Sequence, residues 1–292
     1  MFTYVDCIPC VINKANIIAD KYCIDKADKM RFMKKVMKEI IDCDENRAST
    51  ILDAKIMRIT EREYGIKDVY KEEKKFFNDR LLEMEEEIEK ILDKSENRLF
   101  DALKIALSGN IIDFSALHDL ELDFVKEIIN KTINSEFNEN LFNKFKKDLQ
   151  KGGNLLYLGD NAGEIVFDKI FIKEIKKEYK DINIVFATRG KPVINDVTLE
   201  DAKYVGMDNI CQIIDNGTDI PGTDLVETSE SFNNYFKSSN IIIAKGQGNY
   251  ETLCDNKENI YFLFLCKCDM MVKNLGRDKF SNVFINQLKG EL

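Results

Sequence analysis

Histidine is almost absent from this 292-residue chain, which contains one, His118. This scarcity argues against a zinc or iron centre built from imidazole ligands. We interpret His118 itself as a helix-surface or packing residue. Proline is also scarce, and two of the three prolines, Pro192 and Pro221, follow apolar segments, where they favour rigid loops.

Long apolar segments and an excess of positive charge are missing as well. The longest apolar runs, such as residues 261–266, are far shorter than the roughly 20 residues of a membrane span. The N-terminus lacks a basic region followed by an apolar stretch. The net charge of -9 provides no basic surface for a nucleic acid backbone. We therefore expect a cytoplasmic protein that binds neither nucleic acids nor membranes.

The eight cysteines form an even number, which is compatible with disulfides. The length of the chain and the lack of an export signal favour reduced thiols instead. Cys7 and Cys10 have the Cys-x-x-Cys spacing of metal and redox sites, and Cys266 and Cys268 form a second close pair. A zinc site that combines Cys7 and Cys10 with two distant thiols stays open, with unligated thiols as the simpler interpretation.

The pattern of apolar residues divides the chain into two halves. From Pro9 to Gln150 they recur every three or four residues, which predicts an all-helical N-terminal domain over residues 1–150. In residues 151–292, short β-rich runs alternate with amphipathic helices such as 165–179 and 224–237. The runs are continuously apolar, as in parallel strands buried on both faces, and comprise residues 155–158, 182–188, 210–214, 241–244 and 260–265. The alternation predicts an α/β fold: a Rossmann-like three-layer αβα domain with a mainly parallel sheet.

Three polar loops directly follow these runs, at residues 159–164, 189–198 and 245–249. Because parallel strands end at the same edge of a sheet, the loops should meet in one crevice. Asp160, Asn161 and Asp196 supply oxygen donors there, which hard cations such as Mg²⁺ and Mn²⁺ prefer. The loops thus predict a divalent metal site.

Cations also stand at the strand ends, where Arg189, Lys245 and Lys267 could neutralise a phosphoryl group. Gly159 and Gly163 would let the backbone approach such an anion at a helix N-terminus. An ordinary strand-helix turn, with Asp160 and Asn161 as turn formers, stays open as the alternative for residues 159–163. The usual glycine patterns of NAD and P-loop ATP sites are absent from the sequence.

Several of these segments resemble the signatures of a known family. Gly-Asp-Asn-Ala-Gly-Glu (159–164), Pro-Val-Ile-Asn-Asp-Val-Thr (192–198) and Lys-Gly-Gln-Gly-Asn-Tyr-Glu (245–251) are similar to motifs of the metal-dependent damage-control phosphatases, long known as a domain of unknown function and including a member once described as an acidic-residue methyltransferase. Cys7-x-x-Cys10 and Gly-Asn-Ile-Ile-Asp (109–113) resemble motifs of the prokaryotic stand-alone branch. Residues 264–267 keep only the lysine of the Arg-Thr-x-Lys signature of the eukaryotic branch.

The resemblance implies a phosphatase that hydrolyses small phosphomonoesters, either sugar phosphates or damaged phosphorylated metabolites. Asp160, Asn161 and Asp196 would hold one divalent ion, namely Mn, Co, Ni or Mg. Glu164 would be available to orient water, and the nucleophile would be a metal-activated water or a carboxylate. The phosphate-binding residues implied are Lys245, Gly246, Gly248, Asn249, Lys267 and Arg189.

Two other functions stay open. An αβα domain with a strand-end Gly-Asp loop is also compatible with an S-adenosylmethionine-dependent methyltransferase. That cofactor calls for an acidic ribose ligand at the end of the second strand, where this chain has Thr188 and Arg189. The crevice could also serve a non-catalytic, metal-dependent metabolite-binding protein. The motifs specify a shared phosphate group rather than the rest of the ligand, and they specify no oligomeric state.

Overall fold

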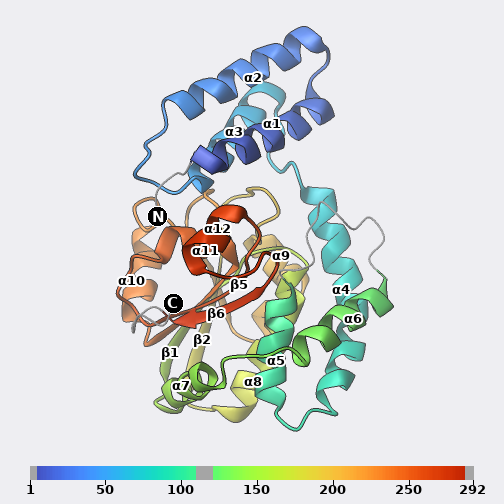
Figure 1. Cartoon of the computed structure of the whole chain (residues 1–292), viewed down its shortest axis with the longest axis vertical. Coiled ribbons are helices and arrows are strands. Elements are labelled where there is room, and N and C mark those ends of the chain that lie inside the picture. The colour runs from blue at the N-terminus through green and yellow to red at the C-terminus, as the bar shows by residue number, and fades with distance from the viewer. Residues whose placement is uncertain (1–4, 110–120, 287–292) are drawn as a thin grey trace.

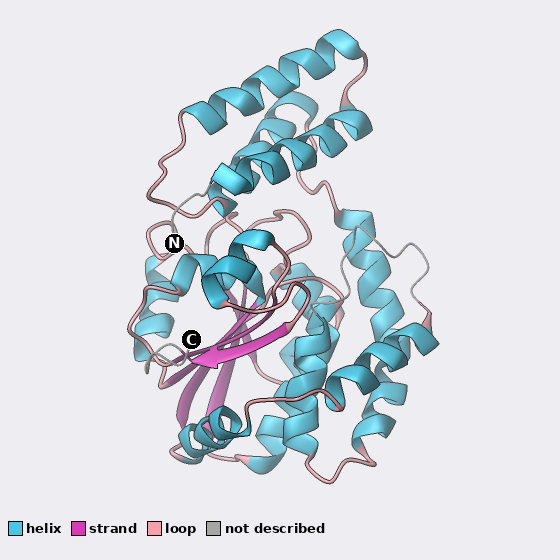
Figure 2. Cartoon of the chain, in the orientation of Figure 1, coloured by secondary structure: helices cyan, strands magenta, loops and turns pink. Residues whose placement is uncertain are grey.

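The computed structural model describes residues 5–109 and 121–286, and its helices surround a single six-stranded sheet (Figure 1, Figure 2). The helices are η1 (Val5–Cys7), α1 (Ile8–Tyr22), α2 (Lys26–Ile41), α3 (Thr50–Tyr64), α4 (Lys71–Leu92), α5 (Arg98–Ser108), α6 (Leu122–Ile133), α7 (Glu139–Gln150), α8 (Glu164–Glu178), α9 (Leu199–Tyr204), η3 (Met207–Asn209), α10 (Glu230–Ser238), α11 (Gly246–Leu253) and α12 (Asp269–Leu275). The strands are β1 (Gly153–Leu158), β2 (Ile182–Thr188), β3 (Gln212–Asp215), β4 (Ile241–Lys245), β5 (Ile260–Leu265) and β6 (Asn282–Asn286).

The strands are ordered β3-β2-β1-β4-β5-β6, and only the last, β6, runs antiparallel to its neighbour. Leu155 on β1 is paired with Ile184 on β2 and with Ile241 on β4. The chain builds outward from β1 to β3 and then crosses back to place β4 on the other side of β1. The order therefore reverses between β1 and β4, where ligands bind in open α/β sheets.

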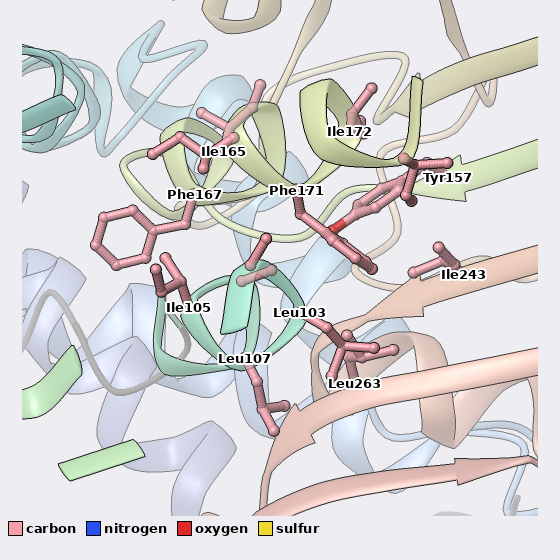
Figure 3. Packing of buried hydrophobic residues seen from close by; sticks show 14 of the residues in the cluster. Leu103, Ile105, Leu107, Tyr157, Ile165, Phe167, Phe171, Ile172, Ile243 and Leu263 are labelled. Carbon is pink, nitrogen blue, oxygen red and sulfur yellow. The ribbon is translucent and has the colours of Figure 1, made fainter. Parts of the chain in front are cut away.

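Successive strand residues point to opposite faces of the sheet, and each face packs against its own helices. Leu155 and Tyr157 belong to a core shared with α4 to α9, whereas Leu156 and Leu158 belong to a core shared with α10 to α12. Figure 3 shows side chains of α5 and α8 gathered against those of β1, β4 and β5 in the first core. The predicted three-layer fold with a mainly parallel sheet is confirmed.

Helices α4 to α7 contribute to the same core as the sheet. Phe145 of α7 is fully buried, with its ring centroid 5.0 Å from that of Tyr261 on β5 and 6.2 Å from that of Phe171 on α8. Helices α1 to α3, which we call the helical cap (residues 8–64), form a separate cluster that also includes Val193 and Ile220 from loops after β2 and β3. The helical cap thus lies over the carboxyl edge of the sheet (Figure 1).

Ion pairs fix the helical cap to the loop that follows β3. Arg58 on α3 donates to Asp219 at 2.7 Å, and Arg47 before α3 donates to Asp224 at 2.6 Å. The same loop accounts for a difference from the sequence interpretation, because the helix expected over 224–237 begins only at Glu230. Ser229 caps it by accepting a hydrogen bond from the Phe232 amide.

Two strands also differ from expectation. The run at 210–214 becomes a strand only from Gln212, because η3 and its following turn occupy the preceding residues. The sequence analysis did not predict β6, which has only three consecutive apolar residues. His118 and most of the 109–113 motif lie outside the described residues.

Replacing Phe145 with alanine should lower the free energy of unfolding by about 3 to 5 kcal/mol, because it leaves a cavity where α7 meets the sheet. As a matched control, Phe280→Ala removes a ring that is 67% exposed and should change stability by less than about 0.5 kcal/mol. Urea unfolding followed by circular dichroism measures both. Parental stability of Phe145→Ala would show that α7 is not part of the sheet core.

Candidate active site at the carboxyl edge of the sheet

The loops after β1 and β4 touch at the point where the strand order reverses. A Cβ atom at Gly246, the first residue of α11, would lie 1.9 Å from a carboxylate oxygen of Asp160, and Gly246 has a φ of +80°. A Cβ atom at Gly159 would lie 2.5 Å from the Phe186 ring. Both positions require glycine, so that the Asp160 carboxylate can lie directly against the start of α11.

The loop after β2 is bonded to the loop after β1 and carries Asp196 to it. The Val197 amide donates to the Asp160 carbonyl oxygen at 2.8 Å, and the Ala162 amide donates to the Asn195 carbonyl oxygen at 2.9 Å. Ile194, two residues before Asp196, has a φ of 37°, which is strained for a β-branched residue. Such strain persists only where surrounding contacts impose it, so the position of Asp196 is strongly determined.

Arg189 lies between the two aspartates. Its Nε donates to Asp196 Oδ2 at 2.7 Å, and one of its terminal nitrogens is 3.9 Å from Asp160 Oδ1. Asn161 Nδ2 donates to Asp160 Oδ2 at 2.9 Å. Arg189 and Asp196 are almost completely buried, and the same terminal nitrogen of Arg189 has no hydrogen-bond partner. A buried guanidinium donor is thus left available to an anion.

Negative charge is crowded in this cluster. Burial, together with the charges of Asp196 and Glu164, raises the pKa of the Asp160 carboxyl well above its usual value, against the opposing effects of Arg189 and Lys267. Burial also raises the pKa of Asp196, although Arg189 opposes the shift. Carboxylates in such a setting gain from a nearby cation.

Lys245 takes a different direction from the one expected for a phosphate ligand. Its Nζ is fully buried and donates to Asp168 Oδ1 at 2.6 Å, to the Ala106 carbonyl oxygen at 2.7 Å, and to Glu164 Oε1. Tyr157 also donates to Asp168 Oδ1, at 2.6 Å. All three ammonium protons are therefore used by protein acceptors, and a direct contact with phosphate would have to replace one of them.

Of the remaining predicted phosphate ligands, some lie near Asp160 and others form contacts between the loops. Asn249 donates to the Lys245 carbonyl oxygen at 2.7 Å and accepts from the Thr223 hydroxyl at 2.7 Å, so that its amide joins two loops. Gly248 packs against Gly222, where a Cβ atom would lie 2.3 Å from the Gly248 carbonyl oxygen. Lys267 is half-buried after β5, and its charge opposes the rise of the Asp160 pKa. The structure thus brings Asp160, Asn161, Asp196, Arg189, Glu164, Gly246 and Lys267 together.

The sequence analysis missed several polar residues next to the site. Asp168 lies one helical turn after Glu164 in the buried and mostly apolar first half of α8, and this spacing could have been recognised in the sequence. Lys14 and Asp53 come from the helical cap, and Glu251 comes from the far end of α11. Glu251 ends the 245–251 motif but was given no role. No local pattern identifies Lys14 and Asp53, because only the tertiary packing places the helical cap over the loops.

The cysteines and one cavity are further candidate sites of chemistry in the described part of the chain. All eight cysteines lie in the described part of the chain, and none forms a disulfide. Within residues 5–109 and 121–286, no three His, Cys, Asp or Glu side chains converge as a metal-binding group. A cavity of about 390 Å³ near α4 and α8 is lined by Lys169, Lys173 and Glu85, which pair with one another. It shares no residue with the strand-end loops.

Over the same described ranges, no helix has both the length and the apolar character needed to cross a membrane.

Comparison with known proteins relates this geometry to a family. Residues 3–283 match the damage-control phosphatase ARMT1-like domain. The chain is 33% identical to the uncharacterized protein MJ0202 of Methanocaldococcus jannaschii, over 97% of this chain and 94% of that protein. It is 32% identical to the damage-control phosphatase PH1575 of Pyrococcus horikoshii, over 92% of this chain and 93% of that protein.

A solved structure shows the same arrangement. The crystal structure of a DUF89 family protein from Pyrococcus horikoshii superimposes with a TM-score of 0.88 at 28% identity, covering 98% of this chain and 99% of that one. The match extends over both the helical segments and the sheet. Because the family match covers both the strand-end loops and nearly the whole fold, the chain belongs to the damage-control phosphatase ARMT1-like family.

Proposed function

We propose that this member of a phosphatase family is metal-dependent and hydrolyses small phosphomonoesters. The observation that carries the proposal is the buried cluster of Asp160, Asp196 and Arg189, in which an unused guanidinium donor lies beside crowded carboxylates. Such a cluster can accept a cation and a phosphate group together. The relatives named as damage-control phosphatases support the same reaction class.

The residues present suit one hard divalent ion: Mn, Co, Ni or Mg. Asp160, Asn161 and Asp196 offer oxygen donors only, and a short β-bridge joins Asn161 to Asp196. Burial, together with the charges of Asp196 and Glu164, raises the pKa of Asp160, and a bound cation would favour the ionised form of this carboxylate. When bound, the ion would supply Lewis-acid polarisation of a phosphoryl oxygen.

The chain's own residues can position and neutralise the phosphate. Arg189 can direct its unused terminal nitrogen at a phosphate oxygen, and Lys267 can add a second positive charge from the end of β5. The start of α11 at Gly246 presents backbone amides without an intervening side chain. Together these groups would stabilise charge that builds on the phosphoryl oxygens during the reaction.

Glu164 is the residue we assign to orienting water or accepting its proton, and we assign Lys245 to holding Glu164 in place. The bonds from Lys245 to Glu164 and Asp168 fix the first turn of α8 against β4. Lys245 would then be a positioning residue rather than a phosphate ligand. Two nucleophiles are compatible with this geometry, a water molecule or the Asp160 carboxylate.

No specific observation favours either of the two alternative functions, a methyltransferase or a non-catalytic binding protein. At the end of β2, where a methyltransferase would need an acidic ribose ligand, Arg189 is already paired with Asp196. Non-catalytic capture predicts binding without turnover, so hydrolysis of p-nitrophenyl phosphate with added Mn²⁺, Co²⁺, Ni²⁺ or Mg²⁺ separates it from catalysis.

Removal of metal should abolish that hydrolysis. Protein treated with a chelator and then dialysed should show no turnover of p-nitrophenyl phosphate, and addition of one of the four ions should restore it, because the oxygen donors release and rebind the ion reversibly. Phosphate release measures the rate. Undiminished activity in excess chelator would contradict the role of a metal.

Asp160→Asn and Asp196→Asn should each lower activity by at least about a hundredfold. Loss of a residue that only hydrogen-bonds to a metal ligand already costs up to about a hundredfold, and loss of a ligand itself should cost at least as much. Each change keeps the shape of the side chain but removes a charge. Elemental analysis should show less bound metal in both variants. The melting temperature of Asp160→Asn without metal should stay near the parental value, whereas that of Asp196→Asn should fall, because the change leaves the buried Arg189 without its ion-pair partner. Stoichiometric metal in both variants would show that the ligands are assigned incorrectly.

The two lysines should respond differently to replacement by methionine. Lys267→Met should keep its stability and bound metal but lose about a hundredfold in kcat/KM, roughly 3 kcal/mol of transition-state stabilisation. Lys245→Met should cost about 3 to 5 kcal/mol of stability, because it leaves Glu164 and Asp168 buried without their cation. Thermal unfolding and kinetics measured together distinguish the two outcomes. If Lys245→Met unfolds like the parent, the positioning role of Lys245 is wrong.

A further inference from the structure

Helix α4 contacts both of the loops that bear the proposed metal ligands. Its Asn78 side chain accepts a hydrogen bond at 2.6 Å from the amide of Gly163, two residues after Asn161. The Nδ2 atom of Asn78 donates to Asp201 Oδ1 in the first turn of α9, at 3.3 Å. Asn78 is only 1% exposed, and its oxygen, the atom that could bind a metal, is already bonded to the Gly163 amide. Asn78 therefore connects protein elements instead of binding a ligand.

Asp201 is in turn bonded to the loop that bears Asp196. Its Oδ2 atom accepts from the Thr198 amide at 2.9 Å and from the Thr198 hydroxyl at 2.8 Å, in the capping box of α9. Thr198 is only two residues after Asp196. Lys74, one helical turn before Asn78, is buried and donates to the same Asp201 oxygen at 3.0 Å. Two side chains of α4 thus hold the start of α9.

The loop after β1 also packs closely against α4. A Cβ atom at Gly163 would lie 3.0 Å from the Phe77 side chain, and Gly163 has a φ of +79°. A residue with a side chain would be strained there and would crowd α4. The close contact and the bond to Asn78 together leave this loop little freedom to shift relative to α4.

We propose that Asn78 is a positioning residue of the metal site. Its bonds to Gly163 and Asp201, which we call the α4 bridge, set the separation of the two loops and hence of the two metal-binding carboxylates. This inference rests on the proposed metal-dependent function and adds a residue that acts on metal binding without touching the ion. Divalent ions such as Mg²⁺ require their oxygen ligands at nearly fixed distances. A small shift of one loop relative to the other should therefore weaken metal binding.

The test exchanges the two side chains of the α4 bridge. Asn78→Asp keeps the size of the side chain and its bond to the Gly163 amide, but it places a carboxylate oxygen against Asp201 Oδ1. Asp201→Asn keeps an acceptor for Thr198, but it places an NH2 group against that of Asn78. The double variant Asn78→Asp/Asp201→Asn remakes the bond with donor and acceptor exchanged, and it keeps one carboxylate beside Lys74.

Binding of Mn²⁺ to the metal-free full chain is measured by the loss of the electron paramagnetic resonance signal of free Mn²⁺, which requires no turnover. Each single variant should bind Mn²⁺ about tenfold more weakly than the parent, the lower end of the effect of residues that orient metal ligands. The double variant should return to within about threefold of the parental affinity, because the two changes compensate each other. Hydrolysis of p-nitrophenyl phosphate at limiting Mn²⁺ should follow the same order.

Asn138→Ala is the matched control. The Asn138 side chain accepts a hydrogen bond from the Leu141 amide at the start of α7, so the change removes the same kind of bond from a helix that contributes no residue to the site. It should lower the melting temperature and leave the affinity for Mn²⁺ unchanged. Melting temperatures of the bridge variants show whether they are folded in the binding assay. If one single variant is unfolded, the other and the double variant complete the comparison.

Two results would overturn the positioning role of Asn78. Parental affinity for Mn²⁺ in both single variants would show that the α4 bridge does not act on the metal site. Weakened binding that the double variant does not restore would show that the loss has a cause other than the exchanged bond. A different result concerns the proposed function: if the parent binds none of the four ions and hydrolyses no phosphomonoester, the metal-dependent phosphatase function itself is wrong.

Discussion

The buried contact of Lys245 with Glu164 and Asp168 is the constraint on which the rest of the site depends. It joins the last residue of β4 to the first turns of α8, and the bond to the Ala106 carbonyl oxygen adds α5. Burying an ammonium and two carboxylates costs several kcal/mol per ion, which only good geometry recovers. The loop that bears Asp160 and Asn161 lies between β1 and α8, so it inherits its position from this contact. A cluster of this kind contributes little net stability but fixes one arrangement of the three elements.

The strand order determines which polar side chains meet in this arrangement. Because the order reverses between β1 and β4, the helices that follow these strands, α8 and α11, pack on opposite faces of the sheet, and the loops after the two strands meet at the edge between them. Asp160 occupies this place against Gly246, and the β2 loop adds Arg189 and Asp196 from the other side. The strained φ of Ile194 and the absence of a side chain at Gly246 are both local costs of this convergence. These costs persist because the contacts around both residues impose this backbone conformation.

The fold, the family and the convergence of strand-end residues could be predicted from the sequence, because buried parallel strands and their following loops leave strong local patterns. The direction of the Lys245 side chain was not predicted, although the alternation of side chains along a strand indicates it. Lys245 is on the same face of β4 as Ile241 and Ile243, which pack toward α5 and α8. Asn249 was read as a ligand, whereas its amide is used by two loops. The short β6 and the ion pair of Lys14 with Asp53 could not be predicted, since both depend on pairing between residues that are distant in the sequence.

Under the proposed function, charge balance would explain why a cation and a phosphate bind together at this edge. Four buried carboxylates, those of Asp160, Asp196, Glu164 and Asp168, face three cationic side chains, those of Arg189, Lys245 and Lys267. Lys245 balances only one of the two charges of Glu164 and Asp168, so with every group ionised the cluster as a whole has one more negative than positive charge. A phosphate dianion would be repelled from such a cluster in a site of low dielectric constant. A divalent ion held by the oxygen donors, as proposed, would reverse the sign of this excess charge, and the terminal nitrogen of Arg189 that has no hydrogen-bond partner could then bind an anion that the site can hold.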